Sequence, residues 1–184
     1  VSAALDLGVA TSNSTFSCNG YLQVGGWRIK CHKTTGHGSG FTLAYGLQMS
    51  CNPCMMTLAE AIGPNNFYEY VERFGYFEKS GIDLPSEAST IFHKEESIGT
   101  TELATASFGQ NFKISPIQQL MAVTTVANGG YLLTPRLVKE VLDSEGNVIK
   151  TYTTETKRQV ISTATSEKLA TILEEGVSGG AGCK

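Results

Sequence analysis

Apolar residues along this chain fall into runs long enough for buried helices, and the two most informative runs lie close together. Residues 41–49 and 53–63 are both largely apolar, and only the tripeptide Ser50-Cys51-Asn52 separates them. Each run spans two to three helical turns, so the pattern predicts two buried helices joined by a short loop. The loop places a hydroxyl and an amide side chain two positions apart between these helices.

The rest of the pattern predicts further helices and several short strands. The helix that includes Phe67, Tyr70 and Phe74 has an apolar stripe, and another begins at the N-cap Ser115 with Pro116 in its first position. The predicted helices cover residues 65–74, 100–108, 115–128 and 165–177, and the predicted strands cover residues 13–29 (a hairpin), 137–142 and 148–152. Residues 34–40 are glycine-rich but fit no phosphate-binding template.

Composition narrows the class of protein. The 184 residues are 41% apolar and 17% charged, with a net charge of −3, as expected for one globular domain. This charge offers no basic surface for nucleic acid, and no apolar run is long enough to span a bilayer. The chain begins in what resembles the last turns of a helix and stops without a closing element, so we interpret it as an internal piece of a longer protein.

Five cysteines, at positions 18, 31, 51, 54 and 183, are too irregularly spaced for a disulfide-rich scaffold. Cys51 and Cys54 form one Cys-x-x-Cys pair, but structural zinc sites usually add a second pair or two histidines. We therefore expect no metal and no other cofactor. His32, His37 and His93 are interpreted as solvent-exposed loop residues that form no Ser-His-Asp triad.

Six short motifs then follow one another in an order that resembles a known family. They are Ser50-Cys51-Asn52-Pro53, Phe74-Gly75-Tyr76, Gly81-Ile82-Asp83-Leu84-Pro85-Ser86-Glu87, Ala106-Ser107-Phe108-Gly109-Gln110, Ile114-Ser115-Pro116-Ile117-Gln118-Gln119, and Ala127-Asn128-Gly129-Gly130 before Thr134-Pro135. The series resembles the transpeptidase domain of class B penicillin-binding proteins, with most similarity to the cell-division and sporulation members of Gram-positive bacteria. The resemblance covers essentially the whole chain.

The resemblance implies an α+β fold, in which a five-stranded antiparallel sheet has helices on both sides and a helical lobe beside it. Residues 1–184 are expected to form a partial transpeptidase domain, rich in the helical lobe and with only a few antiparallel strands. Two of the family's three motifs, Ser-x-x-Lys with the nucleophilic serine and Lys-Thr-Gly, are absent from this sequence. We therefore expect the 184 residues to be inactive by themselves.

For the intact protein, the resemblance implies a serine-type peptidoglycan D,D-transpeptidase that cross-links stem peptides through an acyl-enzyme and binds β-lactam antibiotics. It also implies a catalytic domain outside the cytoplasmic membrane, an N-terminal membrane anchor absent from this sequence, and a cell-wall glycosyltransferase as partner. Two alternatives stay open: a non-catalytic, penicillin-binding-like interaction module, and a relative that senses or hydrolyses β-lactams.

By the same resemblance, Ser50 and Asn52 are the catalytic residues of this segment. A hydroxyl both donates and accepts hydrogen bonds, so Ser50 can pass a proton between the motif lysine and the leaving nitrogen. Asn52 can hold that lysine in place and donate to the substrate amide. The residues alone allow a simpler interpretation, in which Asn52 is the N-cap of the helix that begins at Pro53.

Cys51 lies between these two residues, where its oxidation state could affect them. One hypothesis is that Cys51 pairs reversibly with Cys31 and reshapes the active site on oxidation. A Cys18–Cys31 disulfide that clasps the predicted hairpin is the main rival pairing. The third interpretation is that Cys51 is a small buried apolar residue.

Overall fold

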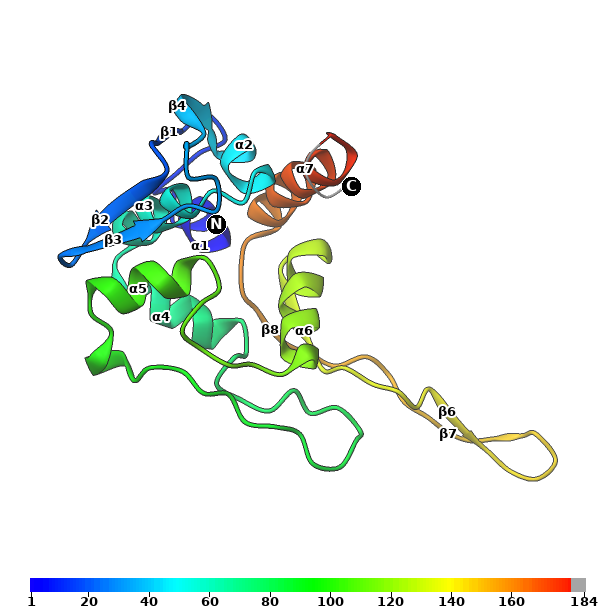
Figure 1. Cartoon of the computed structure of the whole chain (residues 1–184). Helices are drawn as coiled ribbons and strands as arrows, with labels where there is room; N and C mark the ends of the chain where they lie inside the picture. Colours follow the sequence, from blue (N-terminus) through cyan, green and yellow to red (C-terminus); the bar gives the residue numbers. More distant parts are fainter. Residues whose placement is uncertain (180–184) are drawn as a thin grey trace.

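The computed structural model describes residues 1–179 and consists of short helices and paired strands (Figure 1). In chain order the elements are α1 (Ser2–Asp6), β1 (Thr15–Cys18), β2 (Tyr21–Val24), β3 (Trp27–Lys30), β4 (Gly38–Thr42), α2 (Leu43–Gln48), α3 (Asn52–Ile62), α4 (Pro64–Arg73), the 3-10 helix η1 (Glu95–Ser97), α5 (Thr100–Ser107), α6 (Pro116–Ala127), β5 (Tyr131–Leu133), β6 (Glu140–Leu142), β7 (Val148–Thr151), β8 (Thr156–Gln159) and α7 (Thr163–Gly179). The predicted combination of many helices with a few antiparallel strands is confirmed.

The strands of the described residues form two-stranded antiparallel pairs: β1 with β4, β2 with β3, β5 with β8, and β6 with β7. Gly25 and Gly26 join β2 to β3 with φ values of +55° and +83°, as the tight type I′ hairpin turn requires. The predicted hairpin is therefore confirmed for residues 21–30. The prediction was wrong for the first part of the range 13–29, because residues 15–18 pair with β4. Alternation of side chains marks a strand but does not identify its partner.

Two predicted boundaries shift where β4 meets α2. The predicted glycine-rich loop ends earlier, because Gly38 pairs with Cys18 and begins β4. The predicted helix 41–49 begins only at Leu43, because Thr42 is its N-cap and its hydroxyl accepts a hydrogen bond from the N–H of Tyr45 at 3.3 Å. The strand and the helix that lead to Ser50 are thus joined without a flexible connection.

The core lies beneath the junction of α2 and α3. Ala4, Leu43, Cys51, Cys54 and Leu132 are completely buried there. Helix α3 packs against α1 and α5, and α2 packs against α7. The loop between α2 and α3 is therefore anchored at both ends by helices that are themselves packed.

Asp6 joins three helices at the edge of this core. Its Oδ2 accepts a hydrogen bond from the Tyr70 hydroxyl of α4 (2.6 Å), and its Oδ1 accepts from the Ser162 N–H and from the Thr165 hydroxyl of α7 (2.9 Å each). Burial alone would raise the pKa of Asp6, but these hydrogen bonds favour the carboxylate and lower the pKa below its ordinary value. The ionised carboxylate therefore holds α1, α4 and α7 together.

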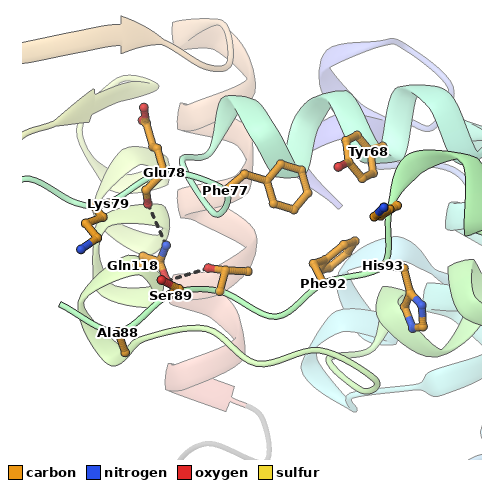
Figure 2. A pocket seen from close by; sticks show the side chains of 11 residues that line it. Tyr68, Phe77, Glu78, Lys79, Ala88, Ser89, Phe92, His93 and Gln118 are labelled. Carbon is orange, nitrogen blue, oxygen red and sulfur yellow. Dashed lines mark hydrogen bonds between the residues drawn. The ribbon is translucent and has the colours of Figure 1, made fainter.

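The predicted start of the helix after residue 115 is confirmed, and it is closed by a capping box. The Ser115 hydroxyl accepts from the Gln118 N–H at 3.2 Å, and Gln118 Oε1 accepts from the Ser115 N–H at 2.9 Å. The buried Gln118 side chain also donates to the carbonyl oxygens of Tyr76 (3.1 Å) and Glu78 (2.9 Å) and accepts from the Thr90 hydroxyl (3.0 Å). One side chain thereby fixes α6 and two loop segments (Figure 2).

The other predicted helices are confirmed, with ends displaced by at most two residues, and so is the second hairpin, whose first strand begins three residues later than predicted, at Glu140. The β6–β7 hairpin extends away from the helices (Figure 1), and its side chains are exposed on both strands. Within residues 1–179, no helix combines the length and the apolar character needed to cross a membrane.

Candidate active site

Ser50 follows the C-terminal end of α2 in a backbone conformation that serine rarely adopts. Its φ is +48°, in the left-handed region. The N–H of Ser50 donates to the Leu47 carbonyl at 3.0 Å, and the N–H of Cys51 donates to the Gly46 carbonyl at 2.9 Å. These two bonds form the Schellman arrangement, in which the left-handed position usually belongs to glycine.

A serine in that position leaves its side chain exposed, at the sharp turn between two packed helices. Left-handed backbone at a residue other than glycine costs on the order of 1 kcal/mol and is concentrated at functional sites. The strain at Ser50 thus agrees with a hydroxyl that is held in place for chemistry.

Asn52 is the first residue of α3, and its side chain does not cap the helix. The N-cap is Cys51, which makes no side-chain capping bond. The capping interpretation of Asn52 is therefore wrong, because its Nδ2 donates to the carbonyl oxygen of Lys30 at 3.1 Å instead. This bond connects the Ser50-Cys51-Asn52 loop to the end of strand β3.

Cys51 is completely buried, and its side chain meets three other residues from distant parts of the sequence. The sulfur atoms of Cys18, Cys31 and Cys51 and a ring nitrogen of His37 all lie within 4.8 Å of one another. Cys18 ends β1, Cys31 follows β3, and His37 precedes β4. These strand ends therefore converge directly beneath the loop that carries Ser50 and Asn52.

The four described cysteines are free thiols in this structure. The sulfur atoms of Cys31 and Cys51, the predicted redox pair, are close to each other, and so are those of Cys18 and Cys31, the predicted hairpin disulfide. Both pairings stay predictions. Cys183 lies outside the described residues.

Burial and hydrogen bonding affect these groups differently. Burial raises the pKa of the Cys51 thiol far above its ordinary value. Burial also acts to raise the pKa of Cys18, but hydrogen bonds from the backbone N–H groups of Gly20 and His37 outweigh it and lower that pKa. Burial lowers the pKa of His37, and the positive charges of His32 and Lys33 add to this effect, so the imidazole is neutral near pH 7.

A separate pocket of about 200 Å³ lies beside α4 and the segment that leads to η1. Tyr68, Phe77, Phe92 and His93 form its aromatic wall, and Gln118 lies at its other end (Figure 2). Its lining includes no residue of the Ser50-Cys51-Asn52 loop. We therefore place the candidate active site at the loop and not in this pocket.

Comparison with known proteins establishes the family of the chain. A family model described as "Penicillin binding protein transpeptidase domain" matches residues 1–184. The chain belongs to the penicillin-binding protein transpeptidase family. The resemblance to class B members that the sequence motifs indicated is confirmed.

Two relatives and one solved structure illustrate the similarity. Stage V sporulation protein D of Bacillus subtilis is 39% identical over 91% of this chain and 26% of its own length. The probable peptidoglycan D,D-transpeptidase FtsI of Caulobacter vibrioides is 28% identical over 99% of this chain and 29% of its own length. A D,D-transpeptidase domain from Eggerthella lenta, 24% identical, has the same fold with a TM-score of 0.87 over 99% of this chain and 47% of that one. The chain thus spans about a quarter of the curated relatives it matches.

Within this penicillin-binding protein segment, the structure brings together residues that sequence reasoning kept apart. Cys54 does not belong to the group of ligand atoms around Cys51, although Cys-x-x-Cys spacing had joined the two. The interpretation of His37 as a solvent-exposed residue was wrong, because it is half-buried and its Nε2 is fully buried. Spacings of 13, 6 and 14 residues between these positions match no metal-binding motif, so only the convergence of strands could reveal the group.

Proposed function

We propose that this chain is the part of a serine-type peptidoglycan D,D-transpeptidase that carries its second active-site motif. In the intact protein, that activity cross-links stem peptides through a serine acyl-enzyme, and β-lactams acylate the same serine. The observation that carries the proposal is the geometry of the Ser50-Cys51-Asn52 loop. It exposes the Ser50 hydroxyl in a strained conformation and fixes Asn52 beside it.

Ser50 is proposed as a proton relay and not as the nucleophile. Acyl transfer requires a proton to leave the attacking serine and another to reach the departing amine. A hydroxyl group can accept one proton and donate another in the same step, so no charged group is needed at this position. The rigid turn at Ser50 keeps the hydroxyl in one place for that transfer.

Asn52 is proposed to orient the substrate and the catalytic lysine of the intact protein. A carboxamide has two N–H donors and one carbonyl acceptor. The bond to the Lys30 carbonyl uses one donor and fixes the plane of the group. The second N–H and the carbonyl oxygen can then reach the substrate amide and the lysine.

The surroundings follow from the same proposal. The catalytic domain acts on the outer side of the cytoplasmic membrane, with an N-terminal anchor and a cell-wall glycosyltransferase as partner.

We also propose that Cys31 and Cys51 can pair when an extracytoplasmic disulfide donor removes two electrons and two protons from them. Because Cys51 separates Ser50 from Asn52, that bond would displace both catalytic side chains.

The decisive experiment measures acylation of the intact protein by a fluorescent penicillin. Ser50→Ala and Asn52→Ala are each expected to slow acylation by about 10²–10⁴-fold, the usual contribution of a group that transfers protons. Ser86→Ala changes an exposed serine outside the loop and should leave the rate unchanged. Wild-type rates in both loop variants would contradict the assignment.

The same reagent tests the alternatives. The isolated 184 residues lack the nucleophile of Ser-x-x-Lys, so they should form no labelled band; a covalent band would overturn the assignment of roles. In the intact protein, rapid hydrolysis of a β-lactam instead of stable acylation would indicate a β-lactamase-like relative. Absence of any acylation would indicate an interaction module.

A further inference from the structure

The group formed by Cys18, Cys31, His37 and Cys51 has the composition of a metal site. Three thiols and one imidazole converge from four separate segments of the chain, and the three cysteines are at most 3% exposed. Thiolate sulfur and imidazole nitrogen are the ligands that zinc prefers in closed, four-coordinate structural sites. No acidic side chain belongs to the group.

The distances agree with one tetrahedral ion. Zinc–sulfur bonds of about 2.3 Å and zinc–nitrogen bonds of about 2.0 Å place neighbouring ligand atoms roughly 3.5–3.8 Å apart. The Sγ of Cys31 and the Nδ1 of His37 are 3.7 Å apart, and all four ligand atoms lie within 4.8 Å of one another. Side-chain rotations that move the atoms by less than about 1 Å would complete a zinc-sized tetrahedron.

A second, independent observation concerns His37. Its Nε2 is buried and has no hydrogen-bond partner among the described residues. Leaving such a polar atom unpaired costs on the order of 1–3 kcal/mol. Its Nδ1 has only a thiol contact, to the Cys31 Sγ at 3.7 Å, so neither ring nitrogen has a conventional hydrogen-bond partner. A metal bond to one of them would account for the position of this half-buried ring.

The backbone segments that carry the ligands lie in direct contact with one another. The His37 N–H donates to the Cys18 carbonyl at 3.0 Å, and the Cys31 N–H donates to the Gly20 carbonyl at 2.8 Å. A Cβ on Gly36 would lie 2.1 Å from the Cys18 carbonyl oxygen, so only glycine permits this crossing. The segments that carry the ligands are therefore held together by the fold and do not meet by chance on a mobile surface.

A disulfide explains less of this arrangement. Pairing any two of the three cysteines leaves the third thiol and the His37 imidazole outside the bond, with at most a weak sulfur–nitrogen hydrogen bond such as the one of 3.7 Å between the Cys31 Sγ and the His37 Nδ1. One zinc ion can bind one atom from each of the four side chains at once. Binding releases three thiol protons and gives the site a net charge of −1, next to the positive charges of Lys30 and Lys33.

We propose that Cys18, Cys31, His37 and Cys51 bind one zinc ion in the reduced protein. The ion would connect the ends of β1 and β3 to the N-terminus of α3. Because Cys51 lies between Ser50 and Asn52, it would also fix the catalytic loop from below. A disulfide between any two of the three cysteines, formed when an extracytoplasmic disulfide donor takes up the two electrons, would remove two thiolate ligands and release the ion. Metal binding and disulfide formation therefore exclude each other at this site.

The test begins with the intact wild-type protein, reduced, incubated with zinc chloride and separated from free metal by gel filtration. Elemental analysis by mass spectrometry should find about one zinc per chain. Cobalt in place of zinc should give the visible bands of a tetrahedral ion and a near-ultraviolet thiolate charge-transfer band. Zinc should also protect Cys18, Cys31 and Cys51 from alkylation, located by peptide mass spectrometry.

Matched variants assign the ion to this group. Cys31→Ala removes one ligand and should lower the zinc content to background, whereas Cys54→Ala removes a buried thiol outside the group and should keep one zinc per chain. Wild-type protein without zinc after gel filtration, or cobalt without a thiolate band, would overturn the proposal even if a variant fails to fold. Full zinc content in Cys31→Ala would overturn it as well.

The rate of acylation provides a measurement that is separate from the zinc content. If the proposed transpeptidase role of Ser50 is correct, chelation of zinc from the wild-type protein should slow acylation by fluorescent penicillin. Zinc content and the cobalt spectrum do not depend on that role. Failure of the metal site and failure of the proposed function can therefore be told apart.

Discussion

The left-handed conformation of Ser50 makes a specific prediction about two variants that both lack the hydroxyl. Ser50→Ala keeps a Cβ at a φ of +48°, whereas Ser50→Gly removes it. Both changes should slow acylation equally, because both remove the proposed proton relay. They should differ in stability, because only glycine enters this region without steric cost.

The size of the difference follows from two opposing effects. A left-handed L-residue costs about 1–2 kcal/mol compared with the right-handed region. Glycine avoids that cost but loses about 0.5–1 kcal/mol more conformational entropy on folding. The Schellman bonds from the N–H groups of Ser50 and Cys51 are unaffected by either change. The free energy of unfolding should therefore be about 0.5–1 kcal/mol higher for Ser50→Gly than for Ser50→Ala.

Pulse proteolysis of the intact protein in increasing urea measures this difference, and fluorescent penicillin measures acylation of the same samples. Ser86 provides a matched control, because it is an exposed serine with a φ of +65° outside the site. Ser86→Gly should gain the same stability over Ser86→Ala with no change in acylation. A Ser50→Gly protein less stable than Ser50→Ala would refute the strained geometry, and normal acylation in either variant would refute the relay.

Two further predictions concern the scaffold. Gln118→Leu removes the bonds to two loop carbonyls and half of the capping box, so the free energy of unfolding, measured in urea, should fall by about 2–4 kcal/mol. Gln119→Leu, at an exposed position of the same helix, removes only the bond from the Tyr76 hydroxyl and should lower it by no more than about 1 kcal/mol. Equal effects of the two changes would contradict the role of Gln118 in fixing the two loop segments. Asp6→Asn should lower the free energy of unfolding near pH 7. The difference in this free energy from wild type should shrink as the pH falls below about 4, because a carboxylate whose pKa is lowered by folding contributes stability only while it is ionised. A difference that grows on acidification would contradict this prediction.

Local interactions explain why much of the architecture could be predicted. The helix at residues 116–127 starts with Ser115 because a capping hydroxyl and the following proline act within a few residues. The hairpin at residues 21–30 follows from two adjacent glycines, which set the turn without help from the rest of the chain. Spacing along the chain also placed Ser50 and Asn52 at one junction between two helices, and the structure differs only in making Asn52 the first residue of α3.

The errors lie where distant segments meet. Residues 15–18 pair with β4 and not within the hairpin, because strand pairing is a tertiary choice. The pattern indicated that Asn52 caps a helix. Its side-chain Nδ2 instead donates a hydrogen bond to the carbonyl oxygen of Lys30, which lies at the end of β3. His37 is a loop residue by pattern, yet the β1–β4 pairing places it against Cys18 and Cys31.

The helices and the family could therefore be inferred from the sequence alone, because helices depend on neighbouring residues and the family was indicated by the order of motifs. The group of side chains beneath the Ser50-Cys51-Asn52 loop could be recognised only in the folded chain. Cys18, Cys31, His37 and Cys51 are separated by unremarkable spacings, and their side chains meet because the ends of three strands and one helix converge on a single buried point. Such convergence depends on the path of the whole chain through space, which no local pattern records.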